Sequence, residues 1–222
     1  MNWTIRYVTR VSTTRVLGPY ERAALWVFGC CFDCDGCIAH RYKSGTCLSA
    51  SANEMAEWFL STGKEHLTIS GGEPFLQSEA LAEMIAIIRR NRDTGVIIYT
   101  GFTLEELSGR AQTDSGVSAL LQAADILIDG RYIRELDDER PYIGSSNQRV
   151  IPLTDRYADV IDSCYNSGGA RKIELSLDAE KTLLVGVPSA SQRQLWEQMK
   201  AFADQRESRN HPDHGGENGK EY

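Results

Sequence analysis

The stretch LWVFGCCFDCDGC, residues 25–37, places four of the chain's six cysteines directly behind an apolar run. Cys30, Cys34 and Cys37 have the spacing C-x3-C-x2-C, and Cys31 stands beside the first of them. The apolar residues have the length of a buried strand, which a glycine ends. The pattern therefore predicts several thiols on one tight loop at the end of a strand. Disulfides, zinc sites, redox dithiols and iron–sulfur clusters all use clustered cysteines.

Composition narrows the classes of protein that this chain can represent. The net charge of −7 over 222 residues provides no basic field for nucleic acid. No window approaches the roughly 18 apolar residues of a membrane span, and no secretory signal is evident at the N-terminus, so we expect a cytoplasmic protein without a membrane or nucleic-acid partner. We expect one domain over residues 1–204, followed by a polar, disordered tail over 205–222.

The spacing of the cysteines and the expected compartment argue against three of the four kinds of site. A structural zinc site takes four closed ligands, but Cys47 and Cys164 are isolated and form no second pair. A thioredoxin-like dithiol needs only Cys34 and Cys37, and it leaves Cys30 without a role. Disulfides are rare in a reducing compartment. An iron–sulfur cluster, in contrast, uses three thiolates from one short loop.

Three thiolates for four irons leave one iron without a protein ligand. By the logic that separates open catalytic zinc sites from closed structural ones, an open iron is a place for a substrate or cofactor. Cys31 is expected to be a bystander, because adjacent cysteines rarely both reach one small cluster.

Apolar periodicity predicts alternating strands and helices along the chain. We expect Ser78 to cap one of the helices, and Ser49 or Ser51 to cap another. Repeated strand–loop–helix units indicate an α/β fold with a mostly parallel sheet, in which chemistry gathers at the carboxyl ends of the strands. The predicted strands are 23–28, 66–70, 96–100 and 126–128, the helices are 52–60, 78–90, 103–107, 117–123 and 191–204, and a hairpin is expected over 171–177 and 182–187.

The cysteine motif and a second motif together resemble the radical S-adenosylmethionine superfamily. C-x3-C-x2-C follows an apolar strand, and a later strand ends in Gly71-Gly72-Glu73-Pro74. The resemblance implies that Cys30, Cys34 and Cys37 hold a [4Fe-4S] cluster, whose open iron is chelated by the methionine moiety of S-adenosylmethionine. It also implies that the glycine-rich turn, with Glu73, accepts hydrogen bonds from the cofactor's amino group. The reduced cluster would cleave the cofactor to methionine and a 5′-deoxyadenosyl radical.

Longer stretches are similar to the family of anaerobic ribonucleotide reductase activating proteins. Cys34-Asp35-Gly36-Cys37 resembles the family's Cys-Pro-Gly-Cys, and further similar blocks follow in the family's order. These blocks are residues 68–77, 98–107, 125–132 and 144–149. The usual Gly-Pro-Gly-x-Arg block reads Gly18-Pro19-Tyr20-Glu21-Arg22 here, and Cys31 and the polar tail are further departures. The family implies a partial (βα) barrel that is open on one side, so that a protein substrate can present a loop.

The resemblance assigns cofactor-binding positions to the carboxyl edge of the sheet. Glu73 could otherwise be a simple turn carboxylate, and Thr100 could merely end a strand. Asp129 and Arg131 could contact the cofactor or the partner, as could the loop around residues 147–149. The predicted cofactor-binding residues are Gly36, Cys37, Ile38, Gly71, Gly72, Glu73, Thr100, Asp129 and Arg131.

The leading hypothesis is an activase that forms a glycyl radical on a partner enzyme, and the expected partner is an anaerobic ribonucleotide reductase. The cluster and S-adenosylmethionine carry the chemistry, so no catalytic side chain beyond them is expected, and an external reductant such as flavodoxin or ferredoxin is needed. One alternative is a radical S-adenosylmethionine enzyme that modifies a small molecule or peptide. Another is a non-catalytic electron-transfer module, which would leave residues 71–74 without a purpose.

Overall fold

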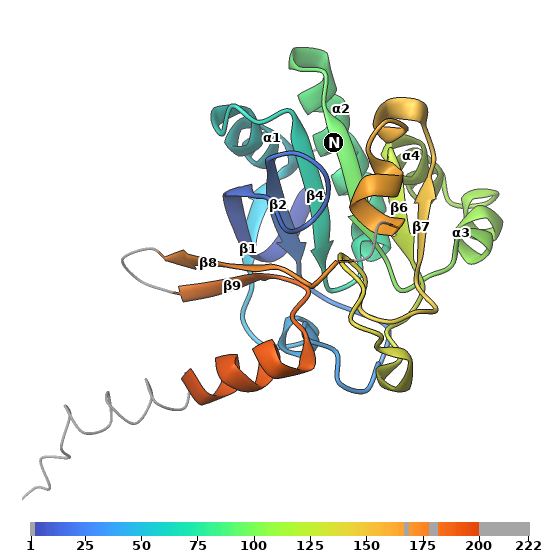
Figure 1. Ribbon diagram of the computed structural model, residues 1–222. Helices are drawn as coiled ribbons and strands as arrows, with labels where there is room; N and C mark the ends of the chain where they lie inside the picture. The colour runs from blue at the N-terminus through green and yellow to red at the C-terminus, as the bar shows by residue number, and fades with distance from the viewer. Residues whose placement is uncertain (1–2, 167–168, 178–181, 200–222) are drawn as a thin grey trace, which may run out of the picture. The chain divides into compact units, whose positions relative to one another are not determined.

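The computed structural model describes residues 3–166, 169–177 and 182–199. Its main element is a sheet of seven strands (Figure 1). The strands lie in the order β3-β1-β2-β4-β5-β6-β7. Their bounds are β1 Thr4–Thr14, β2 Arg22–Val27, β3 Leu48–Ser51, β4 His66–Gly71, β5 Gly95–Tyr99, β6 Ile126–Asp129 and β7 Arg149–Pro152.

The four central strands, β2, β4, β5 and β6, run parallel to one another. β1 and β7 pair antiparallel with β2 and β6, and β3 pairs antiparallel with β1. The register aligns Val27 with Gly71 and Ile98 with Leu127, so the carboxyl ends of the parallel strands lie at one edge. β3 and β7 are the two ends of the order and leave the sheet open. The predicted α/β class with a largely parallel, open sheet is confirmed.

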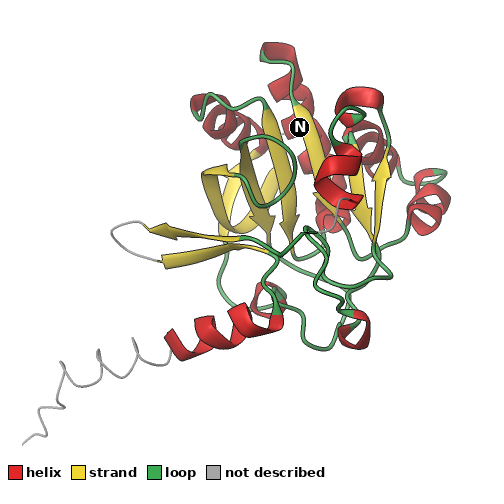
Figure 2. Cartoon of the chain, in the orientation of Figure 1, coloured by secondary structure: helices red, strands yellow, loops and turns green. Residues whose placement is uncertain are grey.

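All four main helices cover one face of the sheet (Figure 2). They are α1 Ala52–Ser61, α2 Ser78–Asn91, α3 Leu104–Ala111 and α4 Ser115–Ala123. Their apolar stripes, at positions such as Met55, Leu81 and Leu120, pack on alternate strand residues such as Leu25 and Ile98. This alternation gives the helices one continuous core.

Helix starts follow the expected capping chemistry at α1 but not at α2. Ser51 caps α1 and forms a capping box with Glu54, which confirms one of the two expected caps. The predicted cap at Ser78 is wrong, because this residue already has helical backbone angles. A 3-10 turn, Pro74–Gln77, leads directly into α2 and makes Gln77 the residue before the helix.

Later parts of the chain cover the opposite face of the sheet. Tyr157 and Tyr165 pack on Ile97 and Ile128, and Val185 packs on Trp26 and its neighbours. Val185 belongs to the hairpin of β8, Ile173–Leu177, and β9, Thr182–Gly186, which confirms the predicted hairpin. Both faces of the central strands are therefore buried, as parallel strands require.

Arg171 fastens the loop between β6 and β7 from inside the protein. Its side chain is 1% exposed and pairs with Asp137 at 2.7 Å. It also donates to the carbonyl oxygens of Arg140, Ile143 and Gly144 at 2.7–3.0 Å. The loop that follows β6 thus depends on one buried guanidinium.

Replacing this guanidinium is expected to destabilise the protein strongly. Arg171→Met removes the buried guanidinium that pairs with Asp137 and donates to the carbonyls of Arg140, Ile143 and Gly144, which should lower the free energy of unfolding by about 3–5 kcal/mol. Urea denaturation measures this change, with Arg90→Met on the exposed face of α2 as the matched control. Equal stability of the two variants would contradict the role assigned to Arg171.

The second compact unit spans 188–222, of which the structure describes residues 188–199. Ser189 and Gln192 form a reciprocal pair of side-chain to backbone hydrogen bonds that starts a helix over residues 190–199. The predicted helix over 191–204 is present as far as 199. Residues 200–204 and the predicted tail lie outside the described residues. No helix among the described residues is long and apolar enough to cross a membrane.

Candidate cofactor site at the carboxyl edge

The cysteine loop begins directly after β2. Gly29 has φ +94° and Gly36 has φ +70°, backbone angles that favour glycine. Gly29 directly precedes Cys30, and Gly36 directly precedes Cys37. Cys30, Cys34 and Cys37 are half-buried free thiols, whereas Cys31 is exposed. The loop thus presents the predicted ligands from one short turn.

Contacts from other elements fix the loop at three points. Gly29 N donates to the carbonyl of Tyr42 at 2.8 Å. Lys43 Nζ lies 2.7 Å from Asp33 Oδ1, and Arg134 Nη2 donates to Asp35 Oδ1 at 3.1 Å. A Cβ at Gly36 would lie 2.6 Å from the Arg134 side chain, so the glycine also makes room for this contact.

The environment of Cys30 and Cys37 favours the protonated form of their thiols when no cluster is bound. Burial raises the pKa of Cys30 and of Cys37, and Cys30 also interacts electrostatically with the thiols of Cys31 and Cys37. Thiolate ligation must therefore release protons. In the described part of the chain, no three His, Cys, Asp or Glu side chains converge as a ready metal site. Three closely spaced thiols nevertheless fit a [4Fe-4S] cluster in their chemistry.

The Gly-Gly-Glu-Pro turn at the end of β4 is hydrogen-bonded to the start of the cysteine loop. Gly72 N donates to the carbonyl of Val27 at 2.8 Å, and Glu73 N donates to the carbonyl of Gly29 at 2.7 Å. Gly71 has φ +111°, and a Cβ at Gly72 would lie 2.0 Å from the Gly29 oxygen. Both glycines are therefore required for the turn to lie against the loop that carries Cys30.

Gly72→Ala is expected to disrupt this contact. The added methyl group meets backbone rather than a flexible side chain, so the turn must move, at a cost of about 3 kcal/mol. We expect reduced iron incorporation together with the loss of stability. Iron content and thermal unfolding measure the effect. Gly109→Ala is the control, because a Cβ there meets no atom within 4 Å and this glycine, like Gly72, has no positive φ. Full iron loading and unchanged stability in Gly72→Ala would contradict the close approach.

Glu73 connects the ends of β4 and β5. Its side chain is 1% exposed and accepts hydrogen bonds from Thr100 Oγ1 and Phe75 N at 2.9 Å, and from Gly101 N at 2.8 Å. Burial raises the pKa of Glu73 to about 7, against the opposing effect of these three donors. The predicted cofactor residues Glu73 and Thr100 are therefore brought together, and their side chains bond to one another.

Asp129 is the last residue of β6, and Arg131 lies two residues further on. The two side chains have different environments. Asp129 is fully buried and accepts from Leu104 N at 2.7 Å and from Arg149 Nε at 3.0 Å. The side chain of Arg131 is 56% exposed and stacks on the ring of Phe32, with its guanidinium carbon 4.6 Å from the ring centre. Of the two, Arg131 is the one available to a ligand.

The remaining predicted positions lie close to this edge. Ile38 is half exposed just after Cys37. Asn147 Nδ2 donates to the carbonyl of Arg131, and Gln148 Nε2 donates to the carbonyl of Gly130, both at 2.8 Å. Side chains of the loop around residues 147–149 therefore hold the backbone that follows β6 by hydrogen bonds.

Gln77 is a positioning residue that the sequence analysis missed. Its amide accepts from Arg6 N at 2.7 Å and donates to the carbonyl oxygens of Arg6 and Phe28 at 2.9 and 3.0 Å. It thereby joins the turn after β4 to β1 and to the residue before Gly29. The signal in the sequence was a polar residue at the end of the otherwise apolar turn Pro74–Gln77.

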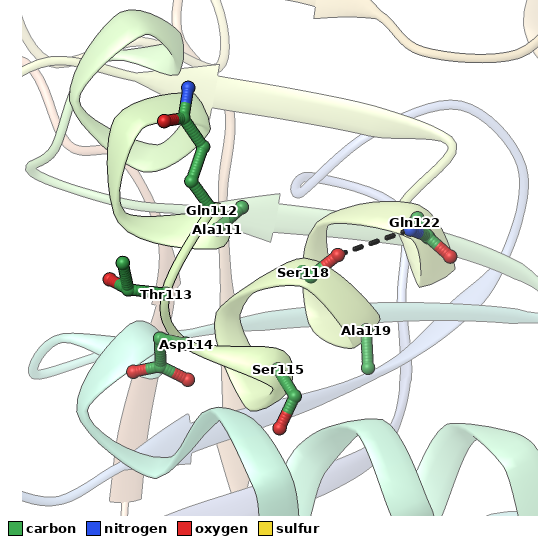
Figure 3. Close-up of a pocket in the computed structure, with 8 residues that line it drawn as sticks. All are labelled: Ala111, Gln112, Thr113, Asp114, Ser115, Ser118, Ala119 and Gln122. Atoms are coloured by element: carbon green, nitrogen blue, oxygen red, sulfur yellow. Dashed lines mark hydrogen bonds between the residues drawn. The ribbon is translucent and has the colours of Figure 1, made fainter.

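A surface hollow between α3 and α4 is separate from these residues (Figure 3). Its lining includes Gln122, whose side chain donates to Ser118 Oγ at 3.1 Å. None of the predicted site residues lines it, so the carboxyl edge remains the candidate site.

Comparison with known proteins supports the interpretation of the cysteine loop as an iron–sulfur site. The 4Fe-4S single cluster domain family matches residues 16–151. The anaerobic ribonucleoside-triphosphate reductase-activating protein of Vibrio cholerae is 31% identical over 150 residues, which cover 63% of this chain and 92% of that protein. The chain belongs to this family of iron–sulfur activating proteins.

Further relatives carry the same name. The Haemophilus influenzae protein of this name is 29% identical over 156 residues, covering 66% of this chain and 97% of the relative. The crystal structure of QueE from Escherichia coli aligns with 58% of this chain and 68% of its own at 15% identity, with a TM-score of 0.36, a similarity too distant to bear on function. The predicted family, enzyme class and [4Fe-4S] cluster are confirmed.

Proposed function

We propose that this protein is a radical S-adenosylmethionine activase that generates a glycyl radical on an anaerobic ribonucleoside-triphosphate reductase. The observation that carries the proposal is the direct bonding of the turn at Gly72 and Glu73 to Val27 and Gly29, immediately before Cys30. Two motifs far apart in the chain thus form one site at the carboxyl edge. The names of the relatives support the choice of partner.

Each part of the site has a role in holding the cofactors. Cys30, Cys34 and Cys37 would ligate the [4Fe-4S] cluster, which when bound and reduced supplies one electron for the cleavage of S-adenosylmethionine to methionine and a 5′-deoxyadenosyl radical. The backbone of Gly71 and Gly72 would lie against the cofactor's amino group. Gly36 and Ile38 would line the cofactor beside Cys37.

The polar residues divide into positioning and contact roles. Glu73 and Thr100 hold the strand ends together, and Asp129 orients Arg149 and the start of α3. The exposed guanidinium of Arg131 is the side chain that would meet a carboxylate of the cofactor or the partner's loop. An external reductant such as flavodoxin or ferredoxin would supply the electron, in the cytoplasm.

Cofactor cleavage provides the test of this function. The chain is reconstituted anaerobically with iron and sulfide, reduced with dithionite and supplied with S-adenosylmethionine. We expect 5′-deoxyadenosine and methionine in equal amounts, and none without dithionite. An intact cluster that yields no 5′-deoxyadenosine would overturn the enzyme and would favour an electron-transfer module.

A further inference from the structure

The ring of Phe32, inside the cysteine loop, is held by groups from two other strand ends. Its centre lies 4.7 Å from that of Phe102 at an interplanar angle of 67°, an edge contact. The guanidinium of Arg131 covers its face. A Cβ at Gly101 would lie 2.5 Å from the ring, so only glycine leaves room for it. We call Gly101, Phe102 and Arg131 the Phe32 socket.

The backbone of the same residue contacts a cluster ligand. Phe32 N donates to Cys30 Sγ at 3.4 Å. The ring and this N–H group are attached to the same Cα, so a ring held in the socket restricts the backbone angles open to Phe32 and with them the direction of the N–H group. Hydrogen bonds to cluster sulfurs are among the factors that set the reduction potential of iron–sulfur proteins.

The socket itself is held from the neighbouring strands. Glu73 accepts from Gly101 N, and Thr100 Oγ1 accepts from Phe102 N at 3.1 Å. On the far side, the guanidinium of Arg110 stacks on the ring of Phe102 at 4.5 Å. Glu73 in the turn after β4 therefore contacts the socket, and the socket contacts Phe32 in the loop that carries Cys30.

We propose that Phe32 is a positioning residue whose ring, seated in the socket, orients its backbone N–H toward Cys30 Sγ and so sets the electronic properties of the bound cluster. The proposal needs the cluster but does not depend on which partner or substrate the enzyme serves. It also gives Gly101 and Arg131 a role in shaping the cysteine loop.

Two substitutions of Phe32 test this assignment. Phe32→Leu removes the edge contact and the stacking, and Phe32→Tyr keeps the ring. In the reconstituted protein, we expect Phe32→Leu to shift the midpoint potential of the cluster to a more negative value, because the reduced, more negatively charged cluster loses a donor. We also expect its electron paramagnetic resonance spectrum to change. Phe32→Tyr should keep the potential and the spectrum of the unaltered chain.

A second variant keeps the test informative if Phe32→Leu binds little iron. Gly101→Ala keeps the phenylalanine at position 32 but places a methyl group 2.5 Å from its ring, so the ring must move. This variant should also shift the midpoint potential to a more negative value. Trp3→Leu replaces an aromatic residue outside the site and serves as the control. The proposal is overturned if Phe32→Leu or Gly101→Ala keeps the original potential and spectrum, or if Phe32→Tyr shifts them as far as Phe32→Leu does. Because these readouts require no turnover, their failure is distinguishable from a failure to form 5′-deoxyadenosine.

Discussion

Cys34→Ser is expected to abolish 5′-deoxyadenosine formation, whereas Cys31→Ser should leave most of it. Cys34 is one of the three spaced, half-buried thiols, and serine replaces a soft thiolate by a poor ligand for iron. Cys31 is exposed and neighbours Cys30, so it is poorly placed to add a fourth ligand. Cys34→Ser should therefore lose nearly all 5′-deoxyadenosine formation and Cys31→Ser little of it, although the two positions are three residues apart.

Iron content, the absorption of the reconstituted cluster and 5′-deoxyadenosine yield measure this difference. Cys47→Ser, outside the loop, provides the matched control for the loss of one thiol. If Cys31→Ser lost its cluster, or if Cys34→Ser kept full activity, the assignment of the three ligands would have to be abandoned.

The stability of the cluster-free chain should depend on pH through Glu73. Burial raises the pKa of this carboxyl from 4.5 to about 7, so the folded state holds its proton more firmly than the unfolded state does. The resulting stabilisation is fully present below pH 4.5 and is lost as the pH rises through about 7. A shift of this size corresponds to about 3 kcal/mol of unfolding free energy.

Glu73→Gln isolates this contribution, because glutamine cannot ionise. The amide group also faces Gly101 N, and this clash of donors lowers stability by a pH-independent amount. Between pH 4.5 and pH 8, the unfolding free energy of Glu73→Gln should therefore rise by about 3 kcal/mol relative to the unaltered chain. Denaturation at both pH values measures the difference, and Glu57→Gln on the exposed face of α1 is the control. A difference between the two chains that stays constant with pH would contradict the buried, proton-holding carboxyl.

Strong apolar periodicity made the central strands and the main helices predictable from the sequence. β2, β4, β5 and β6 appear within one residue of their predicted bounds, because their central residues are buried on both faces and are mostly apolar. β1 was missed, although its inward positions alternate with polar ones, because threonines and arginines dilute the pattern. β3 and β7 have four residues each and depend on pairing with β1 and β6, which a local pattern does not reveal.

The site shows the same division between local and long-range information. The cysteine spacing and the glycine-rich turn are local, so the sequence predicted both. The bonds of Glu73 to Thr100 and of Asp129 to Arg149 join residues that are distant along the chain. Both carboxylates are predicted to lie at the cofactor, and their hydrogen bonds to protein groups could not be foreseen from the sequence. The contact between the ring of Phe32 and Gly101 also joins distant residues, so no local pattern in the sequence predicts it.

The most direct measurement is electron paramagnetic resonance of an anaerobic ribonucleoside-triphosphate reductase after incubation with this protein, reductant and S-adenosylmethionine. The proposed function predicts a stable glycyl radical on the reductase, formed in step with 5′-deoxyadenosine and absent when Cys34→Ser replaces the unaltered chain. Release of 5′-deoxyadenosine without any glycyl radical on the reductase would contradict it.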